Sequence, residues 1–344
     1  MKRTGLVLAA LACAAFGALT ATALYGQIPA LHIYSVDVEG GQATLFVTPA
    51  GQSMLVDTGW PGFNGRDAER IAAAAHKAGV KQIDFLVTTH YHRDHVGGVA
   101  ELAKRLPIAT FIDHGPSVET TDEAKKLYAV YESVASKGKR ITVKPGDTIP
   151  LDGVDVRILT ANGEHIRSAL PGAGQANSAC ADVKPQGVDT GENARSLGFL
   201  LTYGKFRFLD LGDLTWDKEL ELMCPANPIG TVDVFLVSHH GMNISNSPAL
   251  VSGIKPRVAI MNNGAQKGGS PEAWNVVEKS PGLEDLWQLH FSEAGGPEHN
   301  VAEQFIANPG GNDGGNSIDV VAEPDGSFSV ANGRTGFIKN YPAH

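Results

Sequence analysis

The chain has 344 residues, a formal net charge of −9 and 42% hydrophobic residues. This length accommodates one large α/β domain or two small ones, and the composition is ordinary for a soluble globular protein. An acidic chain with no extended run of lysine or arginine repels phosphate backbones, which argues against nucleic acid as a partner.

The first 26 residues have the pattern of a secretory signal peptide. Lys2 and Arg3 precede an uncharged segment rich in alanine and leucine, and Ala21-Thr22-Ala23 offers a small-x-small cleavage site. Without these two basic residues, 26 basic and 37 acidic residues remain, a balance of −11. We therefore predict that residues 27–344 form an exported protein, periplasmic or secreted, without stable membrane association. A retained membrane anchor is the alternative.

Two of the three cysteines remain if Cys13 leaves with the signal peptide. Cys180 and Cys224 then either form a disulfide in an oxidising compartment or stay as two free thiols. Neither lies in a CxxC motif or at a metal-ligand spacing.

Runs of strands with helices between them dominate the pattern along the chain. We expect strands at 32–38, 42–47, 54–56, 83–87, 110–112, 154–159, 197–202, 205–211, 232–237, 257–261 and 286–290, and a hairpin at 317–331. Helices are expected at 67–78, 99–105, 121–136 and 271–279, with a short one between 237 and 257. This mixture predicts a sheet sandwich covered by helices, forming one compact catalytic domain.

One long stretch, 162–193, has no clear period. Loops of this length are often lids or binding loops, and substrate specificity is expected there. His165 lies in this loop and is a weak candidate for substrate contact.

The densest group of ligand-type side chains follows the buried-looking strand at 83–87. It comprises His90, His92, Asp94 and His95. Neutral imidazole and carboxylate are ligands of zinc and similar ions, and a loop at a sheet edge is where function is commonly placed. The first two histidines can point to one side of an extended loop and the next two residues to another, which supplies ligands for two neighbouring ions. The alternative is a solvated histidine-rich turn without metal.

The segment Thr89–Gly98 resembles the metallo-β-lactamase superfamily, whose signature is His-x-His-x-Asp-His after a strand. The resemblance covers about His32 to Phe291. It implies that Asp57 in Leu55-Val56-Asp57-Thr58-Gly59 hydrogen-bonds the histidine loop and that Asp213 in Leu211-Gly212-Asp213 bridges two metals. It also implies an α/β fold, the αββα four-layer sandwich, with the metals at one edge between the two sheets.

The chain departs from the commonest pattern of this family. Asn193 stands where many members have a ligand histidine before the bridging aspartate. Together with His239-His240-Gly241, it is similar to a subgroup containing the extracellular domain of a DNA-uptake competence protein and phosphorylcholine esterases. That subgroup has a late Gly-His-Pro, which is Gly269-Ser270-Pro271 here. His290 is our candidate replacement ligand; the alternative is a structural histidine that caps its strand.

The predicted site contains two ions bridged by Asp213. One ion takes His90, His92 and His239, and the other takes Asp94, His95 and His290. Because adjacent residues of a strand face opposite ways, only one of His239 and His240 is expected to bind metal, and we favour His239. The other would contact substrate or pack. His114 follows a strand and is either close to the site or a hydrogen-bonded loop histidine.

Two divalent ions, zinc with manganese or iron as alternatives, can share a hydroxide that attacks phosphorus or a carbonyl carbon. Asp94 and Asp213 can also assist proton movement. The prediction is an exported binuclear hydrolase of a small ester, with a phosphodiester favoured by the subgroup. The alternatives are lactone or amide hydrolysis, including β-lactams, a mononuclear iron oxidoreductase on the same fold, and a binding protein with a structural metal. Arg93 and Arg195 are available to contact a phosphate, and the oligomeric state is left open.

Overall fold

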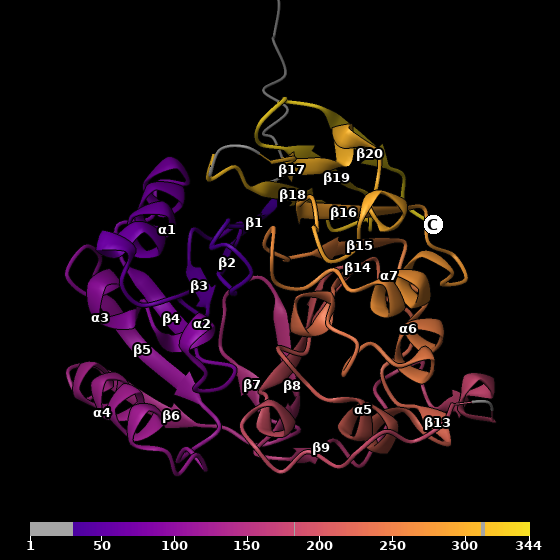
Figure 1. Ribbon diagram of the computed structural model, residues 1–344, viewed down its shortest axis with the longest axis horizontal. Helices are drawn as coiled ribbons and strands as arrows, with labels where there is room; N and C mark the ends of the chain where they lie inside the picture. The colour runs from indigo at the N-terminus through magenta and orange to yellow at the C-terminus, as the bar shows by residue number, and fades with distance from the viewer. Residues whose placement is uncertain (1–29, 182, 311–313) are drawn as a thin grey trace, which may run out of the picture.

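The structure is a computed structural model that describes residues 30–181, 183–310 and 314–344. The predicted signal peptide at residues 1–26 lies outside the described residues. Within them, two nine-stranded sheets pack face to face with helices on both outer sides, and a separate two-stranded sheet joins β10 (Gln175–Ala176) to β13 (Ala226–Asn227) (Figure 1).

The first sheet combines the early strands with the last three of the chain. Its order is β20 (Ile338–Tyr341), β19 (Phe328–Asn332), β18 (Ile318–Ala322), β1 (Leu31–Ser35), β2 (Thr44–Val47), β3 (Ser53–Val56), β4 (Ile83–Val87), β5 (Ile108–Asp113) and β6 (Lys139–Thr142). Strands β1 to β3 form an antiparallel meander, whereas β3 to β6 run parallel. The carboxyl ends of these parallel strands therefore lie along one edge of the sheet.

The second sheet has the same division into antiparallel and parallel halves. Its order is β17 (Ile306–Asn308), β16 (Asp285–His290), β15 (Val258–Met261), β14 (Val234–Leu236), β12 (Phe206–Asp210), β11 (Gly198–Tyr203), β8 (Asp155–Ala161) and β7 (Thr148–Ile149), with β9 (Glu164–His165) beside β8. Strands β12 and β14 to β17 run parallel, and β7, β8 and β11 are antiparallel.

Helices cover both outer faces. Helices α1 (Arg66–Lys77), α3 (Val99–Leu102) and α4 (Asp122–Ala135) pack on the first sheet, on the left in Figure 1. Helices α5 (Trp216–Met223), α6 (Pro248–Ile254) and α7 (Pro271–Glu278) pack on the second, on the right. The one-turn helix α2 (Arg93–Val96) belongs to the histidine loop. None of the helices in the described part of the chain has the length and hydrophobicity needed to span a bilayer.

Three apolar layers hold this arrangement together, and strand β11 shows how the sequence produces them. Phe199 and Leu201 belong to the cluster between the two sheets, whereas Leu200 belongs to the cluster beneath the second helical layer. Successive side chains of a strand point to opposite faces, so an unbroken apolar run serves a strand that is buried on both sides. The αββα four-layer sandwich expected from the family resemblance is confirmed.

Several elements were not predicted from the sequence, among them α5, β6, β17 and β20. Helix α5 has only eight residues, too few for a clear helical period. In β20, Tyr341 is the one fully buried side chain of four, so the alternation that marks a strand is weak. These elements form because neighbouring strands and helices cover them, which no local pattern reports.

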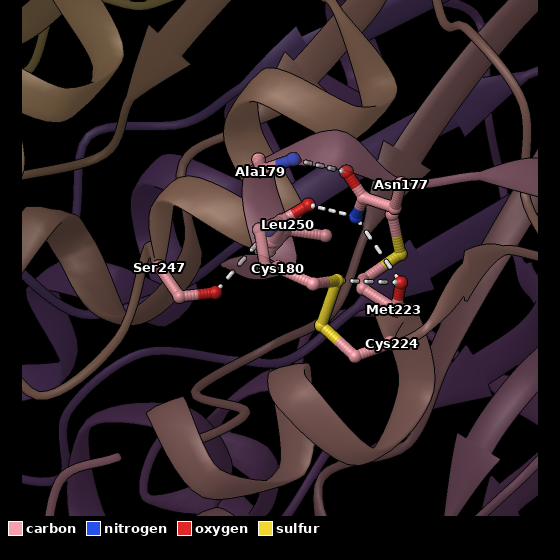
Figure 2. The surroundings of a disulfide bond; sticks show 8 residues. Asn177, Ala179, Cys180, Met223, Cys224, Ser247 and Leu250 are labelled. Carbon is pink, nitrogen blue, oxygen red and sulfur yellow. Dashed lines mark hydrogen bonds between the residues drawn. A yellow bond between two sulfur atoms is a disulfide. The ribbon is translucent and has the colours of Figure 1, made fainter. Parts of the chain in front are cut away.

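A disulfide joins Cys180 to Cys224, with the Cα atoms 5.8 Å apart (Figure 2). Of the two states considered for these cysteines, the structure has the bonded one. Beside the disulfide, the Asn177 side chain donates to the backbone carbonyls of Met223 and Ala249, at 3.1 and 2.8 Å. The disulfide and this amide fasten the long loop at 162–193 to the end of α5 and the start of α6.

Replacing both cysteines, as Cys180→Ala with Cys224→Ala, is expected to lower the free energy of unfolding by about 2–4 kcal/mol. The reason is that the bond closes a loop with a sequence separation of 44 residues, which restricts the unfolded chain. Urea unfolding followed by circular dichroism measures the change. Adding a reductant should destabilise the unaltered protein by a similar amount and leave the double variant unchanged; equal stability of all samples would contradict the expectation.

Candidate metal centre

The histidines and aspartates predicted to bind metal come from the carboxyl ends of parallel strands in both sheets. Asp57 follows β3, and the histidine loop follows β4. From the second sheet, Asp213 follows β12, and the His239-His240 pair follows β14. Since the two sheets pack face to face, these ends meet at one edge of the sandwich. The structure therefore brings together segments separated by more than a hundred residues.

Four buried residues form the tightest group, Asp94, His95, Asp213 and His240. Their potential ligand atoms all lie within 4.8 Å of one another. The His95 Nε2 atom is 3.2 Å from Asp213 Oδ2 and 3.3 Å from Asp94 Oδ2. The His240 Nε2 atom is 3.2 Å from the same Asp94 oxygen. Two imidazoles and two carboxylates at this spacing are a suitable ligand set for a divalent ion.

Two further imidazoles approach the same Asp213 oxygen as His95. His239 Nε2 is 3.3 Å from Asp213 Oδ2, and His90 Nε2 is 3.8 Å from the same oxygen. The His92 ring stands edge-on to His90, with centroids 4.7 Å apart, and its side chain is 38% exposed. Asp213 thus has His90, His95 and His239 at one oxygen and His240 at the other, so both oxygens of this carboxylate are placed to contact a cation.

His239 and His240 both face Asp213. The expectation that strand alternation sends them to opposite sides is wrong, because β14 ends at Leu236 and residues 238–241 form a 3-10 turn. Both histidines have left-handed backbone angles, φ 53° and 54°, which non-glycine residues rarely adopt. Such strained backbone is found at functional sites, where the surrounding structure maintains it. His240, expected only to contact substrate or pack, belongs to the tightest ligand group.

Asp57 orients His95 from beneath. Its Oδ2 atom lies 2.7 Å from His95 Nδ1 and accepts a 2.6 Å hydrogen bond from the Thr89 hydroxyl. Its Oδ1 atom accepts the Thr89 amide at 2.8 Å. A carboxylate can only accept here, so His95 Nδ1 carries a proton and Nε2 faces Asp94 and Asp213. This is the arrangement that fixes ring orientation and basicity in metal-binding histidines.

Buried atoms without partners indicate that the site fits cations. His90 Nε2 and Asp213 Oδ1 are fully buried and have no hydrogen-bond partner among the described residues. Leaving such atoms unpaired costs free energy that a bound cation would recover. Burial holds the pKa of His90 well below its usual value and lowers that of His239 to about 4, so both imidazoles are neutral near pH 7. Neutral imidazole is the form that binds metal.

The carboxyl group of Asp213 is ionised near pH 7, which is the form that binds a cation. Burial alone would raise the pKa of Asp213, but His239, His95 and His240 hold it well below the usual value. For His95 the opposite holds: burial alone would lower its pKa, yet Asp213, Asp94 and Asp57 raise it well above the usual value. A cation entering the site would displace the proton on His95, so binding should weaken as the pH falls.

His290 does not lie in the tightest group; its ring is in a separate cluster with Asp37 and Glu39. Its Nε2 atom is 2.7 Å from Asp37 Oδ1, and Arg70 contacts the other oxygen of the same carboxylate at 3.1 Å. Strand β16 ends beside the connection between β1 and β2, which places the ring against Asp37. The predicted second-ion ligand set is therefore corrected: the structure puts His240 beside Asp94 and His95, where His290 was expected.

Asn193 and His114 lie near the histidine loop without joining the ligand group. His114 Nε2 is 3.1 Å from Glu192, whose carboxylate also accepts the backbone amide of Tyr91 at 3.0 Å. His114 thereby supports the histidine loop through Glu192. The Asn193 Oδ1 atom is buried without a hydrogen-bond partner among the described residues, and its role at the site stays a prediction.

Sequence reasoning missed three polar residues around the site, Lys267, Glu192 and Asp210. Lys267 forms an ion pair with Asp94 and lies 5.1 Å from the centre of the Trp60 ring. Asp210 accepts Gln42 at 2.7 Å, and burial raises its pKa to about 7. Glu192 is adjacent to Asn193. Its charge within an irregular loop was the one feature of the sequence that could have indicated a role at the site. Lys267 lies two residues before Gly269-Ser270-Pro271, and this closeness to the late motif was its one available signal.

One protein-family model matches the part of the chain that carries the histidine loop. The model of the Metallo-beta-lactamase superfamily matches residues 36–182, the segment with Asp57 and the histidine loop. The chain is similar to this superfamily over that segment. Its sheet order and four-layer packing agree with that similarity.

Curated relatives of the chain include two competence-type proteins. It is 25% identical over 253 residues to Recombination protein 2 of Haemophilus influenzae, covering 73% of this chain and 26% of that protein. It is 27% identical over 188 residues to ComE operon protein 3 of Bacillus subtilis, covering 54% of this chain and 20% of that protein. The chain thus spans about a quarter or less of the length of these relatives.

A third relative carries the name of an enzyme. The chain is 29% identical over 133 residues to the hydroxyacylglutathione hydrolase of Xanthomonas campestris pv. campestris, covering 39% of this chain and 42% of that protein. The resemblance to the competence-protein subgroup is confirmed, and the relatives also include a hydrolase.

The substitution Asp57→Asn should lower metal affinity about 10- to 100-fold, because an amide nitrogen beside His95 Nδ1 removes the acceptor that orients the ring. Asparagine tolerates the left-handed backbone at this position, where φ is 61°, so the fold is expected to persist. Zinc binding measured by competition with a chromophoric chelator gives the affinity. Asp84→Asn is the matched control, since Asp84 bonds Ser53 and not the site; unchanged affinity of Asp57→Asn would contradict the role assigned to Asp57.

Proposed function

We propose that this chain is an exported, binuclear metal-dependent hydrolase that cleaves a small ester, with a phosphodiester as the favoured class. The observation that carries the proposal is the position of Asp213. Its carboxylate contacts four imidazoles: His90, His95 and His239 approach Oδ2 at 3.8, 3.2 and 3.3 Å, and His240 approaches Oδ1 at 3.5 Å. A buried carboxylate with imidazoles at both oxygens suits two neighbouring cations.

The residues divide into two ligand sets in this proposal. One cation would be held by His90, His92, His239 and Asp213, and the other by Asp94, His95, His240 and Asp213. A pair of divalent cations, when bound, polarises the substrate and lowers the pKa of water towards neutrality. The chain's own residues orient these groups: Asp57 fixes the His95 ring, and Ser245, 3.1 Å from His239 Nδ1, contacts the outer nitrogen of that ring.

Lys267 supports an anionic substrate. Its ammonium group contacts Asp94 and lies over the Trp60 ring, at the margin of the ligand group. With Asp94 engaged by a cation, this ammonium is the nearest charge available to a phosphate or carboxylate oxygen. Charge-assisted hydrogen bonds of this kind are stronger than neutral ones, so they favour an anionic ester over a neutral lactone.

A carbonyl substrate is the second candidate. The similarity to a hydroxyacylglutathione hydrolase supports hydrolysis at a carbonyl carbon, and the same ligand groups would serve it. Export is proposed from two features, the signal-peptide pattern of residues 1–26 and the disulfide between Cys180 and Cys224. Disulfides persist in oxidising compartments such as the periplasm or the extracellular space.

Asp213→Ala should abolish hydrolysis and lower metal occupancy, because it removes the carboxylate common to both ligand sets. Metal content by inductively coupled plasma mass spectrometry and turnover of bis-p-nitrophenyl phosphate, a lactone and a β-lactam are measured on the same samples. His76→Ala on the exposed face of α1 is the matched control. A fully metallated and fully active Asp213→Ala protein would show that the bridge is wrongly assigned. Two zinc or manganese ions per chain support hydrolysis, whereas one iron ion would favour oxygen chemistry.

Lys267→Met should lower kcat/KM for bis-p-nitrophenyl phosphate about tenfold and leave turnover of the neutral p-nitrophenyl acetate nearly unchanged. The loss corresponds to one charge-assisted contact of about 1–2 kcal/mol. Lys125→Met, on the exposed surface of α4, controls for the general loss of a positive charge. Equal losses for both substrates would mean that Lys267 acts through the ligand Asp94 and not on the substrate.

A further inference from the structure

A large pocket lies on the outer face of the second sheet, away from the candidate metal centre. Its volume is about 940 Å³, within the usual range for small-molecule sites. Residues 164–171 of the long loop form one wall, and β8, β11 and the start of β12 form the other. We call it the outer pocket.

The second sheet separates the outer pocket from the metal centre. Leu200 lines the pocket and belongs to the outer apolar layer, while its neighbours Phe199 and Leu201 point into the layer between the sheets. Along β12, Lys205 and Arg207 lie at the start of the strand, whereas Asp213 follows its end. The pocket and the metal centre are thus on different faces and at opposite ends of this strand.

The pocket is cationic in an acidic protein. Five basic side chains line it, Lys144, Arg157, Arg167, Lys205 and Arg207, against two carboxylates, Asp155 and Glu164. The difference, five minus two, is a local charge of +3 in a chain whose net charge is −9. Low-dielectric walls lined by one sign of charge concentrate the field and attract ions of the opposite sign.

The charged groups of these five basic side chains form few contacts with carboxylates of the described residues. Across residues 30–181, 183–310 and 314–344, none of the five forms an ion pair with a carboxylate. Arg157 donates to the Gly146 carbonyl at 2.9 Å, and Arg207 donates to the carbonyls of Thr231 and Ile229. These uncharged acceptors fix the two guanidinium groups in place. Asp233, which accepts the Arg207 backbone amide at 2.9 Å, offsets part of the Arg207 charge, and Asp325 offsets part of the Lys205 charge.

The remaining surface of the pocket is apolar. Leu200 and Ile166 lie at its base, and Leu170 with Pro171 continues the wall formed by the loop. An inorganic anion would satisfy the cations but leave these side chains without a partner. A ligand with both an apolar body and an anionic group matches both parts of the lining.

We propose that the outer pocket binds an amphipathic organic anion, with its apolar body against Leu200 and Ile166 and its anionic group among Arg167, Lys205 and Arg207. The pocket is a second ligand site, independent of the hydrolase function proposed for the metal centre. The chemistry common to its ligands is a carboxylate, sulfonate or phosphate group attached to an apolar body.

The test is ligand binding to the full-length protein, measured by the fluorescence of 8-anilino-1-naphthalenesulfonate. Saturable binding at one site per chain is expected, with displacement by decanoate. Decanol lacks the charge and inorganic phosphate lacks the apolar body, so neither should displace the probe at equal concentration. Displacement by inorganic phosphate as effective as that by decanoate would overturn the amphipathic class, and displacement by decanol would show that the cations play no part.

Reversing the charge of two side chains that line the outer pocket tests whether the probe binds there. Arg167→Glu combined with Lys205→Glu should weaken probe binding about tenfold or more, since two favourable charges become unfavourable. Both side chains are exposed, so the fold is expected to persist. Lys125→Glu with Lys126→Glu, two exposed lysines of α4, changes the net charge equally and should leave binding unaltered. Equal weakening in both pairs, or no saturable binding in the unaltered protein, would overturn the proposal.

Discussion

The structure depends most on one buried carboxylate, that of Asp213, surrounded by the imidazoles of His90, His95, His239 and His240. A charged group in so dry a place is costly unless opposite charge compensates it. His95, whose pKa is raised well above its usual value, supplies that charge, and a bound cation would supply it in its place. Because these histidines come from both sheets, the sandwich must close for the carboxylate to be stabilised. Fold and site therefore form together.

The supporting interactions follow from the same requirement. Asp57 and Thr89 orient the His95 ring, and Glu192 connects the long loop to Tyr91 and His114. Glu219, fully buried in α5, accepts the amides of Asn246 and Ser247 at 2.7 and 2.6 Å and so fixes the segment after His240. Burial raises the pKa of Glu219 to about 7, which shows how strongly this part of the protein excludes water.

The long loop at 162–193 serves two regions at once. Its early part forms a wall of the outer pocket, and its last residues carry Glu192 to the histidine loop. Between them, the Cys180–Cys224 disulfide fastens the loop to α5. Two short strand pairings, β9 with β8 and β10 with β13, hold the described part of this segment, and the covalent and hydrogen-bonded anchors supplement them. The stretch without periodicity in the sequence therefore contributes both to the outer pocket and to the support of the histidine loop.

The sequence alone determined the layered α/β fold and most of the site, because these depend on local patterns. Apolar strands predict sheets, and His90, His92, Asp94 and His95 are concentrated in six positions after one of them. Only the tertiary structure decided what depends on distant contacts. The turn at 238–241 points both His239 and His240 at Asp213, β16 places His290 against Asp37, and Lys267 reaches Asp94 across 173 positions. No local pattern encodes these approaches, since they arise only when the two sheets pack together.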